Sequence, residues 1–527
     1  MARNRIIYAS QSVWCNGELL YRVQSLGSTT TFTSEDIFEL GHLDIVDVVD
    51  DVPAVAVTLN TNDFGDLRTM ATLAQLPAAK KAMDATVTQT TANLRVVNSA
   101  GAVQSYLHGV SLADFAVVCG NLAGVTIWAP VQDECSLGTL DNNIDQTLFL
   151  DEVYVNSLEF SYTTGANATE NYGAETDNKM WLLNDGRFVT MDSFTVSGTP
   201  TYIDLSLAPS NLIAELSTGN LAFLRKSDEG TPAVTWYDVS RNEVANVAVV
   251  SGTVAAVDTF VYYNTGTEHR VFLPTGTAFD TDDRIEVIYA ADAYGSSATG
   301  SYFTILDNVE RPDMIGALRQ GQVEVYIVSD DDTSFTNAWR LTGCTITSDL
   351  TREALAELGH LAPYDRPLTL PVPITVTIDT TMGDLENWSV FANKREEFAA
   401  DTLDDISLKD LMFEEDLKLV VKVFAQTDED AGGTGSNRKL AGDSPLIGQS
   451  YFNNGTRAVY SAAGEREYAL KTIVVEHLKI TDEGNTLDMG ANMTQTFGFR
   501  STNDLYAVKG DIPISAITSG NKIRRNG

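Results

Sequence analysis

The chain has 527 residues, more than one ordinary domain core of roughly 100–200 residues, with 43% hydrophobic and 20% charged side chains. This composition excludes wholesale disorder. A formal net charge of −37 argues against a surface that grips nucleic acid through its phosphates. No apolar run is long enough for a membrane span and the start lacks a signal-peptide pattern, so we expect neither membrane insertion nor secretion.

The four cysteines have neither CxxC spacing nor the density of a disulfide scaffold. We therefore expect reduced thiols and synthesis in a reducing cytoplasm.

The first predicted element is a Thr/Ser-rich stretch that leads into the motif Glu-Leu-Gly-His-Leu at residues 39–43. The same motif recurs at 357–361, again after a Thr/Ser-rich stretch, 318 residues later. An Asp follows five residues after the His in both copies, at Asp47 and Asp365. Such matched segments are typical of an internal duplication.

The second pair of segments is a β-branched strand that ends in Gly-Asp-Leu, at residues 55–67 and again at 374–385. Short helical patterns follow at 67–76 and 386–400. We expect Asp66 to favour the helix N-terminus in the first copy, and the matching Asp in the second.

Two further pairs complete the repeat. Residues 110–129 match 406–425, and each of these segments ends in an apolar strand. The late segment 154–178 matches 475–504, and both predict a hairpin around a Gly-Ala-Asn turn. Between the copies, short alternating runs separated by Gly, Thr, Ser and Asp turns predict a small sandwich that is not repeated.

The expected fold is therefore mainly β. We assign residues 1–194 to a first module, 195–318 to an inserted β-sandwich domain and 319–527 to a second module. Each module is expected to be a sandwich or barrel with one short helix. The residues expected to hold equivalent structural positions in the repeat are Gly41, His42, Gly65, Asp66, Gly165 and Asn167 in the first copy, and Gly359, His360, Gly383, Asp384, Gly490 and Asn492 in the second.

The copies differ in two loops. The first has 22 more residues at about 75–100, and the second has a Gly/Ser/Asn-rich loop at about 429–460. We expect these loops and the basic chain ends to contact other subunits or rings, although the ends fit solvated tails equally well. The candidate contact residues are Arg3, Arg5, Lys80, Lys81, Arg438, Lys439, Lys522, Arg524 and Arg525.

Motifs for catalysis or cofactor binding are absent: there is no GxSxG elbow, P-loop, glycine-rich dinucleotide loop or HExxH. We expect no enzyme, no cofactor and no metal. His42 and His360 fit structural turns better than half of a metal site. The acidic runs at 280–283 and 330–332 fit solvated turns better than calcium loops, because they lack the Gly and distal Glu of an EF-hand.

This order of segments resembles the tail tube proteins of tailed bacteriophages. The resemblance covers roughly residues 10–195 and 319–527, and it rests on the Gly-containing turn, the strand with its acidic Gly turn, the helix and the late Gly-Ala-Asn hairpin. It implies stacked rings of six modules around a DNA channel, with sheets that merge between modules. Two fused modules per chain would let three chains close a pseudo-sixfold ring.

The resemblance further implies a virion protein synthesised in the host bacterial cytoplasm. Its partners would be copies of itself, other tail proteins at the tube ends, a sheath in a contractile tail, and double-stranded DNA that passes without specific binding. The inserted domain would lie on the outer surface, and acidic residues would line the channel.

Other readings of the sequence stay open. A capsid, sheath or baseplate protein of the same kind of particle would also be acidic, β-rich and poor in cysteine. A calcium-binding surface adhesin of β-sandwiches, or a glycan-active enzyme with paired carboxylates, fits the residues less well.

Overall fold

The computed structural model describes most of residues 11–130, 140–195, 341–381 and 471–526, and separate strands and short segments between these ranges. In these residues the chain forms four β-sheets and two short α-helices, which confirms the expected mainly-β class.

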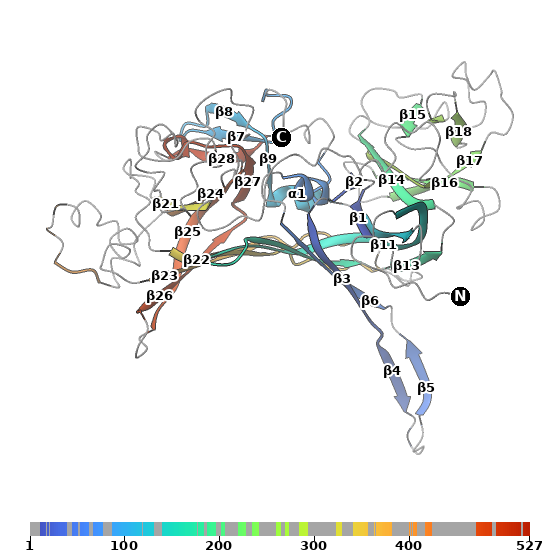
Figure 1. Ribbon diagram of the computed structural model, residues 1–527, viewed down its shortest axis with the longest axis horizontal. Coiled ribbons are helices and arrows are strands. Elements are labelled where there is room, and N and C mark those ends of the chain that lie inside the picture. The colour runs from blue at the N-terminus through green and yellow to red at the C-terminus, as the bar shows by residue number, and fades with distance from the viewer. Residues whose placement is uncertain are drawn as a thin grey trace.

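An arched sheet of eight antiparallel strands, here called the inner sheet, forms the centre of the molecule (Figure 1). Its spatial order joins four strands of the N-terminal half to four strands of the C-terminal half. These are β3 (Val23–Thr31), β6 (Ala54–Thr61), β12 (Thr169–Thr176), β11 (Leu140–Thr163), β22 (Leu341–Asp349), β23 (Pro373–Thr381), β26 (Thr494–Thr502) and β25 (Lys471–Thr486).

Period-two patterning explains why the inner sheet has one buried and one open face. In β6, Val55, Val57 and Leu59 are buried, and the residues between them are exposed. In β23, Ile374 and Val376 repeat this pattern. Alternate side chains of a strand point to opposite faces, so the buried set lies on the convex side of the arch.

Outer strands cover the convex face and enclose a core that draws residues from both halves of the chain. They are β1 (Gln11–Cys15), β2 (Glu18–Leu19), β9 (Gly109–Ser111), β10 (Asn121–Pro130), β13 (Asn178–Leu183), β21 (Val323–Val328), β24 (Leu417–Val423) and β27 (Leu505–Lys509). The expected strands at 55–59, 374–378, 125–129 and 420–423 are confirmed, as are both late hairpins.

The long strands β11 and β25 each belong to an outer and an inner sheet. The change of sheet lies next to a residue with positive φ, Glu152 at 51° in β11 and His477 at 56° in β25. A left-handed residue inside a strand turns the chain sharply. Glu152 and His477 are 325 residues apart, as are Gly165 and Gly490 of the two hairpin turns.

Strand registers also recur between the halves. Thr58 lies opposite Gly173, and Thr377 lies opposite Gly498. Both glycines face a bulge of the neighbouring strand, where a Cβ atom would collide with the side chain of Ser157 or Asp482 respectively. The spacing of each glycine from its bulge therefore has a steric reason.

The two halves also interlock away from the inner sheet. β9 of the N-terminal half pairs with β27 of the C-terminal half. The C-terminal strand β28 (Lys522–Arg525) pairs with β7 (Leu94–Val97), which pairs in turn with β8 (Val103–Leu107). Helix α9 (Ile514–Ile517) packs under this small sheet, with Ile514 and Ile517 buried.

The helix expected at 67–76 is present as α1 (Arg68–Leu73), which buries Met70 and Leu73 against the core. Its N-cap position is Leu67, and no side chain caps it. Asp66, the predicted N-terminal residue, and the predicted helix at 386–399 lie outside the described residues. The 3₁₀ helix η2 (Leu112–Val117) has a capping box between Ser111 and Asp114 instead.

A separate seven-stranded sheet lies at the upper right in Figure 1, away from the concave side of the arch. Its strands are β14 (Arg187–Thr195), β20 (Arg284–Asp292), β16 (Asn220–Ser227), β17 (Val234–Arg241), β18 (Phe260–Asn264), β19 (His269–Phe272) and β15 (Tyr202–Leu205). It contains four of the strands expected in the inserted piece. It also takes in β14, which precedes residue 195.

Candidate functional site

The concave face of the inner sheet is the largest surface of one character among the described residues. Most of its side chains are small, and threonine and alanine predominate. They include Thr29, Thr31, Ala54, Ala56, Thr58, Thr345, Thr347, Thr375, Thr377, Thr494 and Thr496. An open groove crosses the face between Asn60, Asn171 and Thr347.

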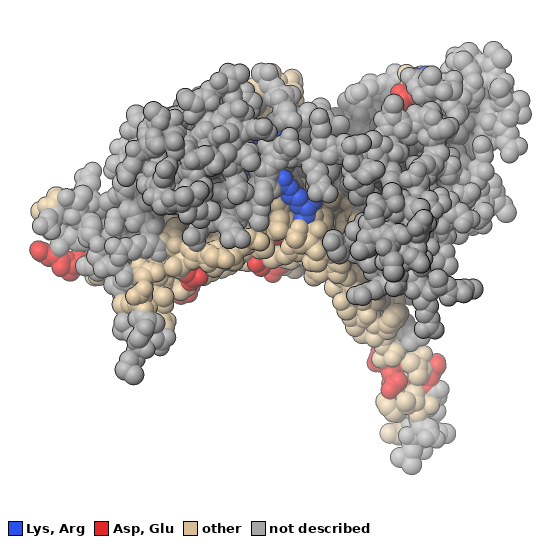
Figure 2. Space-filling model, in the orientation of Figure 1, with Lys and Arg blue, Asp and Glu red and all other residues tan. Residues whose placement is uncertain are grey.

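Acidic side chains outnumber basic ones on this face, and Figure 2 shows them in red along the underside of the arch. The acidic residues are Glu159, Glu175, Asp349, Asp379 and Asp482. The basic residues Lys479 and Arg500 lie opposite each other at one end, in β25 and β26. The rest of the face therefore offers duplex DNA no cluster of cations.

The inner sheet ends in two unpaired edges within the described residues. β3 pairs only with β6, and residues 479–486 of β25 pair only with β26. The two edges lie at opposite ends of the arch (Figure 1). An unpaired edge presents a row of free backbone donors and acceptors, so it is a template for another strand.

The joint between β11 and β22, in the middle of the sheet, shows how two such edges fit together. Phe160 lies opposite Ile346 and Tyr162 lies opposite Cys344, and all four side chains are buried. Burial raises the pKa of the Cys344 thiol to about 12.

A buried ion pair locks this joint. Lys471, at the start of β25, donates a hydrogen bond to Glu170 of β12, and both side chains are almost completely buried. The Tyr172 hydroxyl donates to the same carboxylate at 3.2 Å, and the lysine nitrogen lies 5.2 Å from the centre of the Phe160 ring. Burial raises the pKa of Glu170, and the neighbouring ammonium of Lys471 opposes this shift.

An arginine fastens the segment after β22 across the N-terminal half. Arg352 donates to the carbonyls of Val155 at 3.0 Å, Phe115 at 2.9 Å and Arg366 at 2.9 Å. Its guanidinium lies 5.2 Å from the centre of the Tyr154 ring. Arg366 forms an ion pair with Glu175 of β12 at 2.9 Å, so two arginines of one half hold the other.

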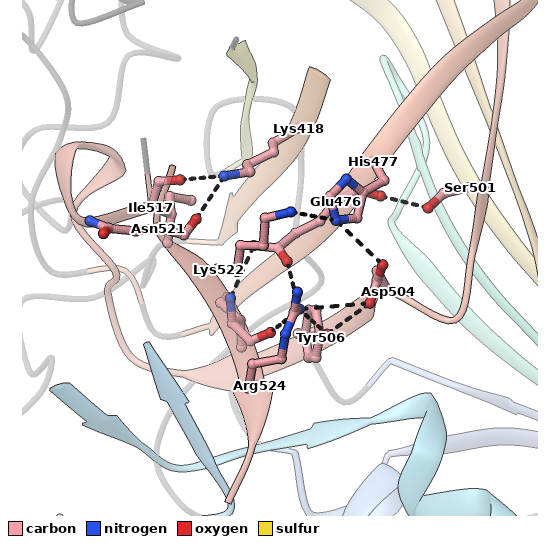
Figure 3. A network of polar contacts seen from close by, with 11 residues as sticks. Lys418, Glu476, His477, Ser501, Asp504, Tyr506, Ile517, Asn521, Lys522 and Arg524 are labelled. Atoms are coloured by element: carbon pink, nitrogen blue, oxygen red, sulfur yellow. Dashed lines mark hydrogen bonds and ion pairs between the residues drawn. The ribbon is translucent and has the colours of Figure 1, made fainter. Parts of the chain in front are cut away.

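A second buried carboxylate, Glu476 of β25, holds the C-terminal strand (Figure 3). It accepts hydrogen bonds from the Ile523 amide at 3.1 Å and from Arg524 at 3.4 Å. Burial raises its pKa, and the charge of nearby Lys418 opposes the shift. Lys418 donates to the carbonyls of Ile517 and Asn521 at 2.7 and 2.8 Å.

The basic residues near the C-terminus are thus engaged within the chain. Lys522 approaches the His477 ring at 3.3 Å, and Arg525 forms an ion pair with the buried Asp114 at 2.8 Å. These contacts account for Lys522, Arg524 and Arg525 without a partner subunit, so we do not carry them into the interface proposed below.

Three residues of the predicted structural set are described. Gly165 has φ +80° in the β11–β12 turn, a conformation that favours glycine, and Asn167 and Asn492 are exposed beside the two hairpin turns. The remaining predicted residues lie outside the described part of the chain. They are Gly41, His42, Gly65, Asp66, Gly359, His360, Gly383, Asp384, Gly490, Arg3, Arg5, Lys80, Lys81, Arg438 and Lys439.

The buried charges were not predicted from the sequence. One signal for them exists: in the strand LKLVVKV, Lys418 and Lys422 interrupt an apolar run, and both are completely buried. Glu170 and Lys471 have no comparable signal, because they are 301 residues apart.

Models of known protein families and the curated proteins return no match to this chain. Within the described residues, no group of three His, Cys, Asp or Glu side chains is placed to hold a metal ion. None of the described helices has the length and apolar character of a membrane span. The acidic runs at 280–283 and 330–332 lie outside the described residues.

Proposed function

We propose that this protein is a structural virion subunit whose copies join edge to edge into rings, and that stacked rings form the tail tube of a tailed bacteriophage. The chain contributes two copies of one module to each ring, so three chains close a ring of pseudo-sixfold symmetry. Its concave face lines a channel through which double-stranded DNA passes.

The recurring registers support two copies of one module. β3, β6, β12 and β11 follow each other in the same spatial order as β22, β23, β26 and β25. Bulges recur at matching sites, between Val23 and Ser25 and between Leu341 and Gly343. The equivalent outer strands also agree, because Ile127 pairs with Gln146 as Val423 pairs with Lys471.

The observation that carries the proposal is the nature of the two open edges. β25 corresponds to β11, and β3 corresponds to β22, by the registers given above. The open edges are therefore counterparts of the two strands that already join inside the chain. A second copy can repeat that joint at each end, and a closed ring leaves no unpaired edge.

The register of the joint between copies follows from the joint within the chain. Phe160 lies opposite Ile346, and the corresponding residues are Asn485 and Ser28. We expect Asn485→Cys with Ser28→Cys to form disulfide-linked oligomers under mild oxidation, read on non-reducing gels. Asn485→Cys with Thr30→Cys is the matched control, because it lies on the same face but two residues out of register, and it should cross-link far less.

Electron microscopy of the wild-type chain tests the assembly itself. Hollow tubes of constant bore are expected. A chain that remains monomeric at high concentration refutes the proposal, and closed shells or a contractile jacket would assign the protein to another structural role in the particle. Tubes that form without the Asn485–Ser28 cross-link would refute only the register.

The acidic and threonine-rich concave face predicts weak DNA binding by the assembled rings. We expect wild-type tubes to retain no duplex DNA at physiological salt. Replacing Glu159 and Asp349 by arginine should create DNA retention that falls steeply as salt rises, since counterions are released from each neutralised phosphate. Filter binding over a salt series measures this. Equal retention by wild type and variant would contradict a DNA-lining role for the face.

A further inference from the structure

The hairpin between β3 and β6 extends beyond the inner sheet, at the lower right in Figure 1. Its strands are β4 (Ser34–Phe38) and β5 (Ile45–Asp50), which pair only with each other among the described residues. Phe32, Phe38 and Leu40 are 79%, 66% and 103% exposed. A lone two-stranded hairpin is marginally stable in water, and clustered exposed apolar side chains mark a contact surface.

The equivalent segment of the C-terminal half is docked. Arg352 bridges to Leu368 and Leu355 bridges to Asp365. These pairs stand 318 residues after Ser34–Asp50 and Ile37–Asp47, which pair in the β4–β5 hairpin. The two segments therefore share one register. The C-terminal one is fastened to the N-terminal half through Arg352 and Arg366.

The chain holds a matching surface for the β4–β5 hairpin, but at its other end. Tyr154 and Glu175, which lie under Arg352 and Arg366, pair with each other across β11 and β12. Their counterparts in β25 and β26 are Lys479 and Arg500. Both of these side chains are exposed.

The charges are reversed along with the positions. Inside the chain a basic hairpin segment covers an acidic site, Arg366 on Glu175. The β4–β5 hairpin has no basic residue in its described strands and presents Glu35, Asp36 and Asp47. Asp36 lies opposite Val48, the counterpart of Arg366, so it is on the hairpin face that corresponds to the docked one.

We propose that the β4–β5 hairpin docks on the β25–β26 end of a second copy of this chain, with Asp36 facing Lys479 and Arg500. The dock repeats the contact of the C-terminal segment within the chain, with the charges exchanged. It rests on the proposed ring, since the same two edges meet there. The exchange makes the contact between copies chemically different from the contact within one chain, which discourages either hairpin from occupying the other's site.

Charge reversal tests this dock. Asp36→Arg and Arg500→Asp should each raise the protein concentration needed for assembly by about tenfold, and the double variant should restore assembly toward the wild-type level. Asp47→Arg is the matched control, because Asp47 pairs with Ile37 on the opposite face of the hairpin. Sedimentation velocity across a concentration series gives the readout, and circular dichroism checks that each exposed variant remains folded.

The outcomes separate this dock from the ring itself. If wild type forms tubes and the Asn485–Ser28 cross-link but neither Asp36→Arg nor Arg500→Asp weakens assembly, the dock is refuted and the ring stands. If the single variants weaken assembly and the double variant gives no rescue, the Asp36 pairing is refuted. If the wild-type chain forms no oligomer, both proposals are refuted.

Discussion

Replacing Lys471 by methionine is expected to lower the free energy of unfolding by about 3–5 kcal/mol, because it leaves the Glu170 carboxylate buried without its cation. Lys471 and Glu170 are 1% and 2% exposed in their side chains, so water cannot take the place of the lost partner. The Tyr172 hydroxyl would still donate to the carboxylate, but a neutral donor compensates only part of the charge. Urea denaturation of the unassembled chain measures the change.

The double variant Glu170→Leu with Lys471→Met is the control for this prediction. It removes both charges and keeps apolar volume at the site, so it should recover most of the loss and is expected to lie near wild type. A Lys471→Met variant within about 1 kcal/mol of wild type would mean that the pair is not desolvated as the structure has it.

Replacing Glu476 by leucine is expected to cost about 2–4 kcal/mol, since it removes the acceptor for the Ile523 amide and the counter-charge for Arg524. Because β28 is held by these contacts and pairs with β7, the loss should appear first as faster amide hydrogen exchange in the last residues. Hydrogen exchange followed by mass spectrometry resolves this region from the rest of the chain.

The conservative variant Glu476→Gln gives this prediction a dependence on pH. Burial raises the pKa of Glu476 above its ordinary value of 4.5, so the folded state holds the proton more tightly than the unfolded state. The stability from this group is then fully present below pH 4.5 and is lost as pH rises through the raised pKa. Wild type should therefore lose stability relative to Glu476→Gln across that range, and the opposite trend would contradict the raised pKa.

The local patterns of the sequence were sufficient for much of the fold. Alternation in 55–59 and 374–378 identified two central strands, and the late hairpins followed from apolar runs around a Gly-containing turn. The helix at α1 was visible in its spacing of apolar residues. These features depend on neighbours within a few residues, so the sequence contains the information locally.

The contacts between distant segments were not predictable in this way. β9 pairs with β27, and the buried Lys471 finds Glu170 in the other half of the chain. A charged residue in a strand is normally exposed, so neither residue was a candidate for the core. The C-terminal basic residues illustrate the same difficulty, because their partners Glu476 and Asp114 lie far away in the sequence.

The sequence by itself determined that the chain is mainly β and that matched segments recur in the same order, because alternation and repeated motifs are local properties of a strand. Only the tertiary structure decided that β11 joins β22 and that β25 and β3 remain open, because pairing of edges depends on where distant strands meet. It also decided the charge of each docking surface. Arg366 and Glu175 face each other only when two halves of the chain are folded together.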